Sequence, residues 1–266
     1  MFSTVSNDLR RLYASPAMAC GRSVLLTPAN SGRSNHPCPV LMLPVEGVIR
    51  VTSHSGEAVV APERAVWIPG HLEYSITAGR PLLVYAVRFW RGLEGGERPE
   101  VFTAAPLLRE MTRHAVQWGE SPPRTEAADA FFTALGGLIG RWRKRVDDVT
   151  LPHADSPELR AGLGWLLGRL GHPVGPVDAA VHANLSLRTF QRRCRAELGV
   201  SPSAWLQRAR VLHGLELLDD DRLSVSEVAL RCGYQSQASF GRVFKDHLGV
   251  TPVAWRSAQA LTSIPA

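Results

Sequence analysis

The sequence FQRRCRAELGVSPSAW at residues 190–205 recurs as FGRVFKDHLGVTPVAW at residues 240–255, an offset of 50 residues. Both copies contain a Phe, then Leu-Gly-Val, then a hydroxyl residue followed by Pro, and finally a Trp. An internal repeat at a fixed offset indicates two copies of one supersecondary unit.

The repeated residues predict where one helix ends and the next begins. In each copy the glycine can adopt the left-handed conformation that ends a helix. The hydroxyl residue can cap the following helix, with proline at its first position. The tryptophan then supplies apolar mass that holds this helix on the core. The residues are Gly199, Ser201, Pro202 and Trp205 in the first copy, and Gly249, Thr251, Pro252 and Trp255 in the second.

A shorter helix and a turn are expected before each Phe. The first copy predicts a helix over residues 175–181 and a turn at Asn184. The second predicts a helix through Arg231 that is capped by Ser224, with the turn at Gly233. Glycine, and after it asparagine, tolerates the positive φ that such a turn needs. A capped helix, a tight turn and a second amphipathic helix describe a helix-turn-helix unit.

The second helix of each unit carries the side chains that predict a DNA target. In the first unit the apolar positions are expected to be Leu187, Phe190, Cys194 and Leu198. This leaves a basic, amide-bearing face suited to base edges and phosphates. Its predicted DNA-contacting residues are Arg188, Gln191, Arg192 and Arg195. The corresponding set in the second unit is Gln237, Ala238 and Arg242, with Lys245 one turn further on.

A single helix is expected between the two units, over residues 202–218. Seventeen residues of helix span about 25 Å, which could hold two recognition helices about one DNA turn, ~34 Å, apart. The alternative is a purely structural helical bundle with a solvated, arginine-rich face. Two copies with matching caps, prolines and tryptophans favour the DNA-binding interpretation.

The N-terminal half has a different periodicity. Short β segments separated by turn residues predict a small antiparallel barrel or sandwich. The expected strands are 23–27, 40–43, 48–52, 58–60, 65–68, 74–77 and 82–89, with turn clusters at 29–32, 54–56 and 69–70. Helical spacing begins beyond residue 100, with helices expected over about 104–145. The predicted class is α+β with two domains: residues 1–150, a linker at 151–157, and an all-α domain at 158–260.

The C-terminal hundred residues resemble the AraC/XylS family of bacterial transcription regulators. The stretch SVSEVALRCGYQSQASFGRVFK at residues 224–245 is similar to that family's signature region. The resemblance implies two helix-turn-helix subdomains joined by a long helix, which bind double-stranded DNA through adjacent major grooves. By position, the base-contacting residues would be Arg188, Gln191, Arg192, Gln237, Ala238 and Arg242. Asn184 stands where the family usually has glycine. Contact with RNA polymerase is a further expectation for such a regulator.

The N-terminal half is similar, more loosely, to the cupin-like sensor barrel of such regulators. The sequence VWIPGH at residues 66–71 resembles that barrel's turn between two strands. The resemblance implies a small-molecule effector site or a dimerisation domain, and a homodimer through helices about 104–145. A filled barrel that serves only dimerisation is the alternative. The candidate effector-binding residues are Trp67, His71, Tyr74 and Tyr85, with Arg88 as a further basic candidate.

Composition and the absence of several motifs narrow the classes of protein to which this sequence can belong. A formal charge of +6 is compatible with a polyanionic partner, and the chain shows no secretory signal or membrane-length apolar stretch. We therefore expect a cytoplasmic protein. The four cysteines, Cys20, Cys38, Cys194 and Cys232, form no CxxC pair and are expected to be buried thiols. Isolated histidines at 36, 54 and 71 argue against a metal site, and no catalytic or cofactor-binding motif occurs.

Three functions remain for comparison. The first is a DNA-binding transcription regulator without enzymatic activity, metal or cofactor. The second is a cupin metalloenzyme that carries a DNA-binding tail, which a stoichiometric transition metal would support. The third is an interaction protein whose basic helices bind RNA or an acidic protein. The duplicated unit favours the first.

Overall fold

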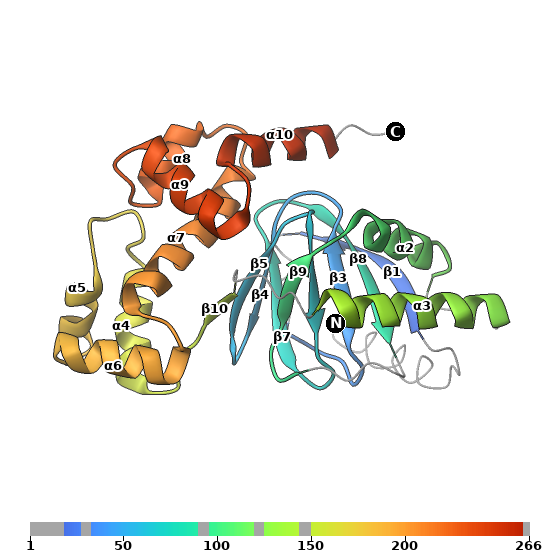
Figure 1. Ribbon diagram of the computed structural model, residues 1–266, viewed down its shortest axis with the longest axis horizontal. Coiled ribbons are helices and arrows are strands. Elements are labelled where there is room, and N and C mark those ends of the chain that lie inside the picture. Colours follow the sequence, from blue (N-terminus) through green and yellow to red (C-terminus); the bar gives the residue numbers. More distant parts are fainter. Residues whose placement is uncertain (1–18, 28–32, 90–95, 120–124, 144–149, 263–266) are drawn as a thin grey trace. The chain divides into compact units, whose positions relative to one another are not determined.

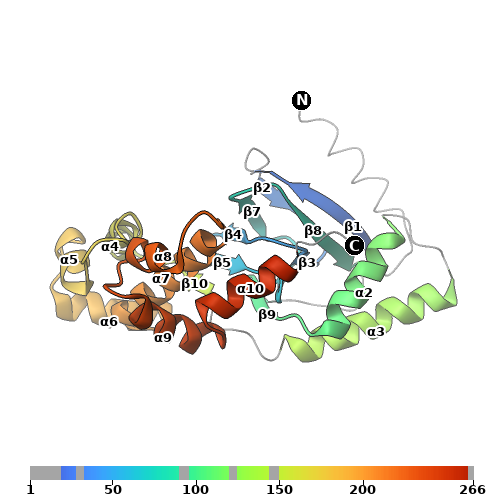
Figure 2. The same cartoon turned by 90° about the horizontal axis from the view of Figure 1, so that it is seen from above.

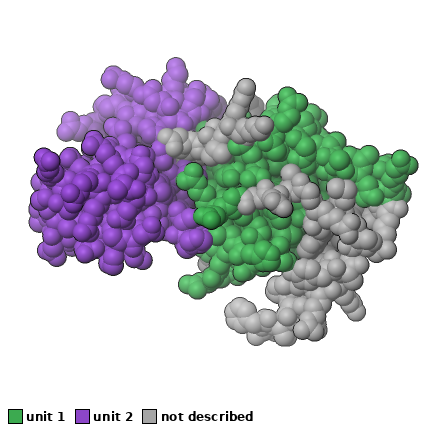
Figure 3. Space-filling model, turned by 60° about the horizontal axis from the view of Figure 1, so that its bottom comes forward, with its two compact units in different colours: residues 1–45, 60–147 green, residues 46–59, 148–266 purple. Residues whose placement is uncertain are grey.

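The computed structural model describes residues 19–27, 33–89, 96–119, 125–143 and 150–262. The chain divides into two compact units, residues 1–45 with 60–147 and residues 46–59 with 148–266 (Figure 3). The turn expected at residues 29–32 lies outside the described residues. No helix in the described part is both long and apolar enough to cross a bilayer.

Unit 1 is the mixed β and α part of the chain. Its described strands are β1 (Ala19–Leu26), β2 (Arg33–Asn35), β3 (Val40–Pro44), β6 (Arg64–Ile68), β7 (Glu73–Ala78), β8 (Leu82–Phe89) and β9 (Glu100–Thr103). A five-stranded sheet has the order β1-β8-β3-β6-β9, and all of its pairs are antiparallel. The antiparallel pair β2–β7 belongs to a second sheet of five strands. Antiparallel sheets match the architecture expected from the short alternating segments.

Two helices, α2 (Pro106–Gln117) and α3 (Glu126–Trp142), follow the strands of unit 1. Helix α2 packs against β1 and β8, as both ribbon views show (Figures 1 and 2). Trp67 and Phe102 from the sheet are fully buried in one core with Phe132 from α3. The predicted helical region at 104–145 is therefore confirmed where the structure describes it.

Unit 2 consists of a small group of strands and seven helices among its described residues. The strands are β4 (Ile49–Ser53), β5 (Gly56–Val60) and β10 (Thr150–Pro152), and β10 pairs antiparallel with β5. The helices are α4 (Pro157–Leu167), α5 (Pro176–His182), α6 (Leu187–Leu198), α7 (Pro202–Leu218), α8 (Val225–Arg231), α9 (Gln237–Leu248) and α10 (Pro252–Thr262). The strands β2, β9 and β10 were not expected from the sequence.

Helix α7 is the shared element of the helical part. It contacts α6 of the first helix-turn-helix, and both α8 and α9 of the second helix-turn-helix. Figure 1 shows α7 between the group α4–α6 and the group α8–α10. The side chains of Trp205 and Leu212 are almost fully buried along it. The long helix predicted over residues 202–218 is confirmed with the same bounds.

Candidate nucleic-acid interface

The recognition helix of each unit begins and ends with the same set of contacts. At α6, the Ser186 hydroxyl accepts a hydrogen bond from the Thr189 N–H at 3.2 Å, and Gly199 ends the helix at φ 72°. At α9, the Ser236 hydroxyl accepts one from the Ser239 N–H at 3.2 Å, and Gly249 ends the helix at φ 78°. The left-handed helix ends predicted from the repeat are confirmed.

The helices that follow are capped by the expected hydroxyl residues. The Ser201 hydroxyl accepts from the Ala204 N–H at 3.2 Å, and Thr251 accepts from the Ala254 N–H at the same distance. Their tryptophans, Trp205 and Trp255, are 1% and 4% exposed. In each helix-turn-helix, a hydroxyl cap therefore sets the start of the recognition helix and a left-handed glycine sets its end.

The two turns also have the predicted backbone. Asn184 has φ 53° and Gly233 has φ 77°, so both lie in the left-handed region. Before the second turn, α8 begins with a capping box: the Ser224 N–H donates to the Glu227 carboxylate at 2.7 Å, and the Glu227 N–H donates to the Ser224 hydroxyl at 3.2 Å. Asn184 therefore adopts the same left-handed backbone region as Gly233.

The apolar face of each recognition helix is packed on small residues of a neighbouring helix. Phe190 and Phe240 are fully buried. A Cβ added to Gly162 on α4 would lie 2.8 Å from the Phe190 ring, and one added to Gly214 on α7 would lie 2.7 Å from the Phe240 ring. Leu187 is only partly buried, because it stands in the first turn of α6 at the edge of the core. The two glycines carried no recognisable signal in the sequence.

The opposite face of each recognition helix is open to solvent. All eight predicted DNA-contacting side chains are exposed: Arg188, Gln191, Arg192 and Arg195 on α6, and Gln237, Ala238, Arg242 and Lys245 on α9. One of them has an internal contact, since the Ser226 hydroxyl donates to the Gln237 amide oxygen at 2.8 Å. Arg193 differs from its neighbours: it is half-buried and forms an ion pair with Glu158 at 3.4 Å.

Glu197, the single acidic residue of α6, has a structural role that the sequence did not reveal. Its carboxylate accepts hydrogen bonds from the Ser156 N–H at 2.9 Å, the Ser156 hydroxyl at 2.7 Å and the Asp155 N–H at 3.0 Å. Burial opposes ionisation, but the hydrogen bonds from Ser156 and Asp155 outweigh it and lower the pKa of Glu197. The carboxylate therefore ties the end of α6 to the start of α4.

Replacing Glu197 by glutamine is expected to lower the free energy of unfolding by about 1–2 kcal/mol, because a neutral amide cannot replace the charge-assisted bonds to three donors. Urea denaturation of the variant measures this loss. Asp246→Asn, at an exposed position on α9, removes the same charge without those bonds and serves as the control. Equal stability of the two variants would contradict this role for Glu197.

The cysteines of the helical part are buried thiols. Cys194 and Cys232 are free, and both are fully buried. Burial raises the pKa of each thiol to about 12, so both stay protonated at neutral pH. The structural interpretation of these cysteines from the sequence is confirmed.

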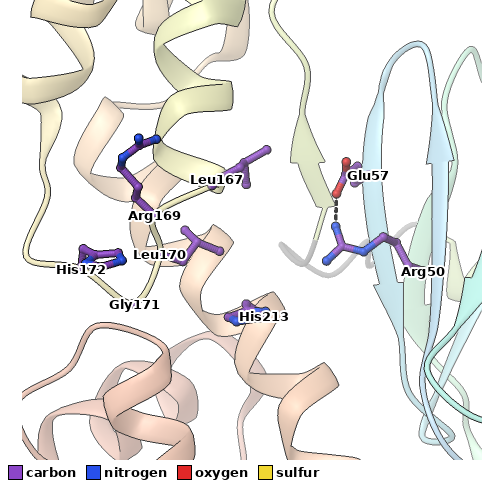
Figure 4. Close-up of a pocket in the computed structure, with 9 residues that line it drawn as sticks. Arg50, Glu57, Leu167, Arg169, Leu170, Gly171, His172 and His213 are labelled. Carbon is purple, nitrogen blue, oxygen red and sulfur yellow. Dashed lines mark hydrogen bonds and ion pairs between the residues drawn. The ribbon is translucent and has the colours of Figure 1, made fainter.

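A hollow of about 330 Å³ lies in unit 2 (Figure 4). Its lining includes Arg50, Glu57 and His213, together with residues 167–172. Two charged side chains of this hollow, Arg50 and Glu57, form an ion pair with each other. The described residues contain no group of three or more His, Cys, Asp or Glu side chains that could hold a metal ion.

The four candidate effector residues occupy different surroundings in unit 1. Trp67 is fully buried in the core that β6 shares with α2 and α3. Tyr74 is 2% exposed, Tyr85 is half-buried and His71 is exposed with φ 62°. Trp67 therefore faces the helices, whereas Tyr74 lies on a different sheet.

Two capped helix-turn-helix units that share a central helix define the helical part as a tandem helix-turn-helix domain. Residues 179–258 match the family model described as a helix-turn-helix domain. The chain is 28% identical over 153 residues to the HTH-type transcriptional activator RhaR of Enterobacter sp. (strain 638), which is 57% of this chain and 52% of that protein. It is 28% identical over 189 residues to RhaR of Escherichia coli (strain K12), 71% of this chain and 61% of that protein.

A solved structure, the DNA-binding domain of the global transcriptional factor AdpA in complex with a target DNA, is 36% identical, with a TM-score of 0.39. The match covers 41% of this chain and 97% of that one. The chain therefore contains a domain of the helix-turn-helix class and is similar to the RhaR transcriptional activators. This chain spans 52% to 61% of the length of the RhaR proteins.

Proposed function

We propose that this protein is a sequence-specific DNA-binding transcription regulator. The observation that supports this most directly is the pair of recognition helices, each capped at both ends, with Arg188, Arg192 and Arg242 exposed. In the proposed mode, α6 and α9 enter two major grooves, where guanidinium and amide groups contact base edges and other basic groups contact phosphates. The mechanism is binding without catalysis.

Arg192→Ala tests this proposal. The variant is expected to lose about 1–3 kcal/mol of binding free energy on the preferred site and to lose preference at one base pair. Sites are first selected from a random DNA pool, and affinities are then measured on single-base variants of the selected sequence. Arg193→Ala is the matched control, because this neighbouring arginine is paired with Glu158. It should leave base preference unchanged.

One outcome would contradict the base contact proposed for Arg192, and another would contradict DNA as the partner. Equal weakening of Arg192→Ala on all sequences would place Arg192 on phosphate instead of a base. An affinity that does not change with salt concentration would exclude DNA as the partner, because phosphate contacts release counterions.

We also propose that unit 1 binds a small-molecule effector and mediates homodimerisation, and that the regulator contacts RNA polymerase in the cytoplasm. The buried polar groups of unit 1 support an effector site, since Tyr74 and Arg88 have polar atoms without partners among the described residues. The boundaries proposed for the domains are residues 1–150 and 158–260.

A further inference from the structure

Arg88 lies on the face of its sheet that points away from the helices of unit 1. In the strand register, Leu41 pairs with both Trp67 and Val87, and this face carries the core shared with α2 and α3. The next pair in this register is Val40 with Arg88, the chain neighbours of Leu41 and Val87. Because side chains alternate between the two faces of a strand, Val40 and Arg88 share the opposite face. Ile68 and Cys20 stand on the same face, opposite Val40 and Arg88 respectively.

Arg88 is buried there without a counter-charge among the described residues. It is 7% exposed, and its Nε atom has no hydrogen-bond partner in the part of the chain that the structure describes. An arginine remains charged under all ordinary conditions, so it cannot avoid the unfavourable transfer of a charge out of water by losing a proton. A buried charge of this kind is stable only when an anion or several acceptors compensate it.

Two further polar groups with the same deficiency belong to this cluster. Tyr74 on β7 is 2% exposed, and its hydroxyl has no partner among the described residues. The same holds for Nδ1 of His36, whose ring centre lies 5.8 Å from that of Tyr74 in an edge-on arrangement. Groups that are buried without partners are rare in native proteins, and three in one cluster indicate a missing partner.

The electrostatic environment of the cluster is positive. Burial, followed by the nearby Arg88 and Arg22 guanidinium groups, lowers the pKa of His36 to about 4. Burial raises the pKa of Tyr74 above its ordinary range, although the same two arginines oppose this. At neutral pH both side chains are therefore uncharged. The Tyr74 hydroxyl and the His36 ring can each donate one hydrogen bond in that state.

We propose that Arg88, Tyr74 and His36 bind the carboxylate of a small effector whose remaining body is apolar. The guanidinium group can hold a carboxylate through two parallel hydrogen bonds, and the tyrosine and histidine can donate to its remaining lone pairs. The neighbours of Arg88 on the same face, Val40 and Ile68, are buried and apolar, which favours an apolar body for the effector. This site deepens the proposed function, because it gives the chemical class of its effector.

The site predicts an unusual response to the loss of a charge. Without ligand, Arg88→Gln is expected to melt at a higher temperature than the wild-type protein, because it removes an uncompensated buried charge. Sodium benzoate and sodium octanoate should raise the melting temperature of the full-length wild-type chain, whereas benzamide and 1-octanol should not. In titration calorimetry, Arg88→Gln should weaken carboxylate binding roughly tenfold or more.

Arg33→Gln is the matched control, since Arg33 is an exposed arginine of β2 that is paired with Glu73 at 3.2 Å. It should bind both carboxylates as the wild type does. If neither carboxylate binds, or if Arg88→Gln melts lower than the wild type in the absence of ligand, the proposal is wrong, and a carboxylate of the chain itself compensates Arg88. Tyr74→Phe should also weaken binding while keeping the ring contact with His36.

Measuring DNA affinity with the same protein separates this site from the proposed function. If the protein binds its selected DNA site but no carboxylate, the anion site fails and the regulator assignment stands. If carboxylates bind but no DNA sequence is selected, the regulator assignment fails and the anion site stands.

Discussion

Replacing Gly233 by alanine is expected to lower the free energy of unfolding by about 3–4 kcal/mol, through backbone strain and a steric clash together. Gly233 has φ 77°, a conformation that residues with a Cβ atom rarely adopt. A Cβ at this position would lie 2.4 Å from the Leu170 carbonyl oxygen. The substitution therefore strains the turn between α8 and α9 and forces it away from a backbone atom.

The carbonyl that would be displaced cannot move easily, because Arg210 holds its segment. The Arg210 Nε–H donates to the Leu170 oxygen at 3.1 Å, and Nη2 donates to the His172 oxygen at 2.9 Å. Relief of the clash would break these hydrogen bonds. Thermal and urea denaturation of Gly233→Ala measure the total loss, and DNA affinity should fall with it.

Gly249→Ala separates the strain from the clash. Gly249 has φ 78°, nearly the same as Gly233, but no atom lies within 4 Å of an added Cβ. This control is expected to lose only about 1 kcal/mol, from the left-handed conformation alone. Equal losses in the two variants would show that the contact with Leu170 is absent. In the other turn, Asn184→Gly should change stability little, since asparagine already adopts φ 53° there.

The helix-turn-helix units could be predicted from the sequence because their signals are local. A cap, a left-handed glycine and a proline at the first helical position each act within about one helical turn. The helix at Pro202–Leu218 was therefore predicted with its observed bounds. The short strands β2, β9 and β10 have three or four residues each and exist through pairing with distant strands. Their own sequences carry too few residues for a periodic pattern.

The inward and outward faces of unit 1 could not be predicted for a related reason. All five residues of β3, VLMLP at 40–44, are buried. A strand that is covered on both faces shows no alternation of apolar and polar residues, so the sequence does not indicate which face a side chain occupies. The helix-facing position of Trp67 and the opposite position of Arg88 became clear only from the strand register.

Contacts between residues far apart in the chain could not be predicted from the sequence. Residues 46–59 belong to the same compact unit as the C-terminal helices, although 88 residues of unit 1 separate the two segments. Arg50 from β4 binds Glu216 on α7 across 166 positions in the chain. No local pattern marks such a pair, because the partners of a charged residue depend on the folded topology.

The ion pairs of Arg50 predict the second large effect on stability. Arg50 donates to both oxygens of Glu216, from Nε at 2.8 Å and from Nη2 at 2.6 Å. It also forms an ion pair with Glu57, which Figure 4 shows beside the hollow of unit 2. The side chains of Arg50, Glu57 and Glu216 are 29%, 16% and 29% exposed. One guanidinium group therefore compensates two partly buried carboxylates.

Arg50→Met is expected to lower the free energy of unfolding at neutral pH by about 2–3 kcal/mol, less than for a fully buried pair because water still screens these groups. The loss arises because Glu57 and Glu216 keep their charges but lose their shared partner. Arg33→Met, which breaks the exposed pair with Glu73, should cost less than about 1 kcal/mol. A smaller loss in Arg50→Met than in Arg33→Met would show that the pairs of Arg50 add no stability.

The pH dependence of stability gives the same interaction a second test. His153, whose Nε2 lies 3.7 Å from the Glu57 carboxylate, is the largest cause that lowers the pKa of Glu57 below its ordinary value of 4.5, and Arg50 adds to it against burial. Burial alone would raise the pKa of Glu216, but His213, whose Nδ1 lies 3.9 Å from the carboxylate, and the hydrogen bonds from Arg50 outweigh it and lower the pKa. Carboxylates with a lowered pKa in the folded state contribute stability above pH 4.5, and this contribution is lost as the pH falls through the lowered values. In Arg50→Met both pKa values should rise, so stability should begin to fall at a higher pH than in the wild type. Urea denaturation between neutral pH and about pH 3 measures this shift, and identical profiles for the two proteins would contradict the role of Arg50.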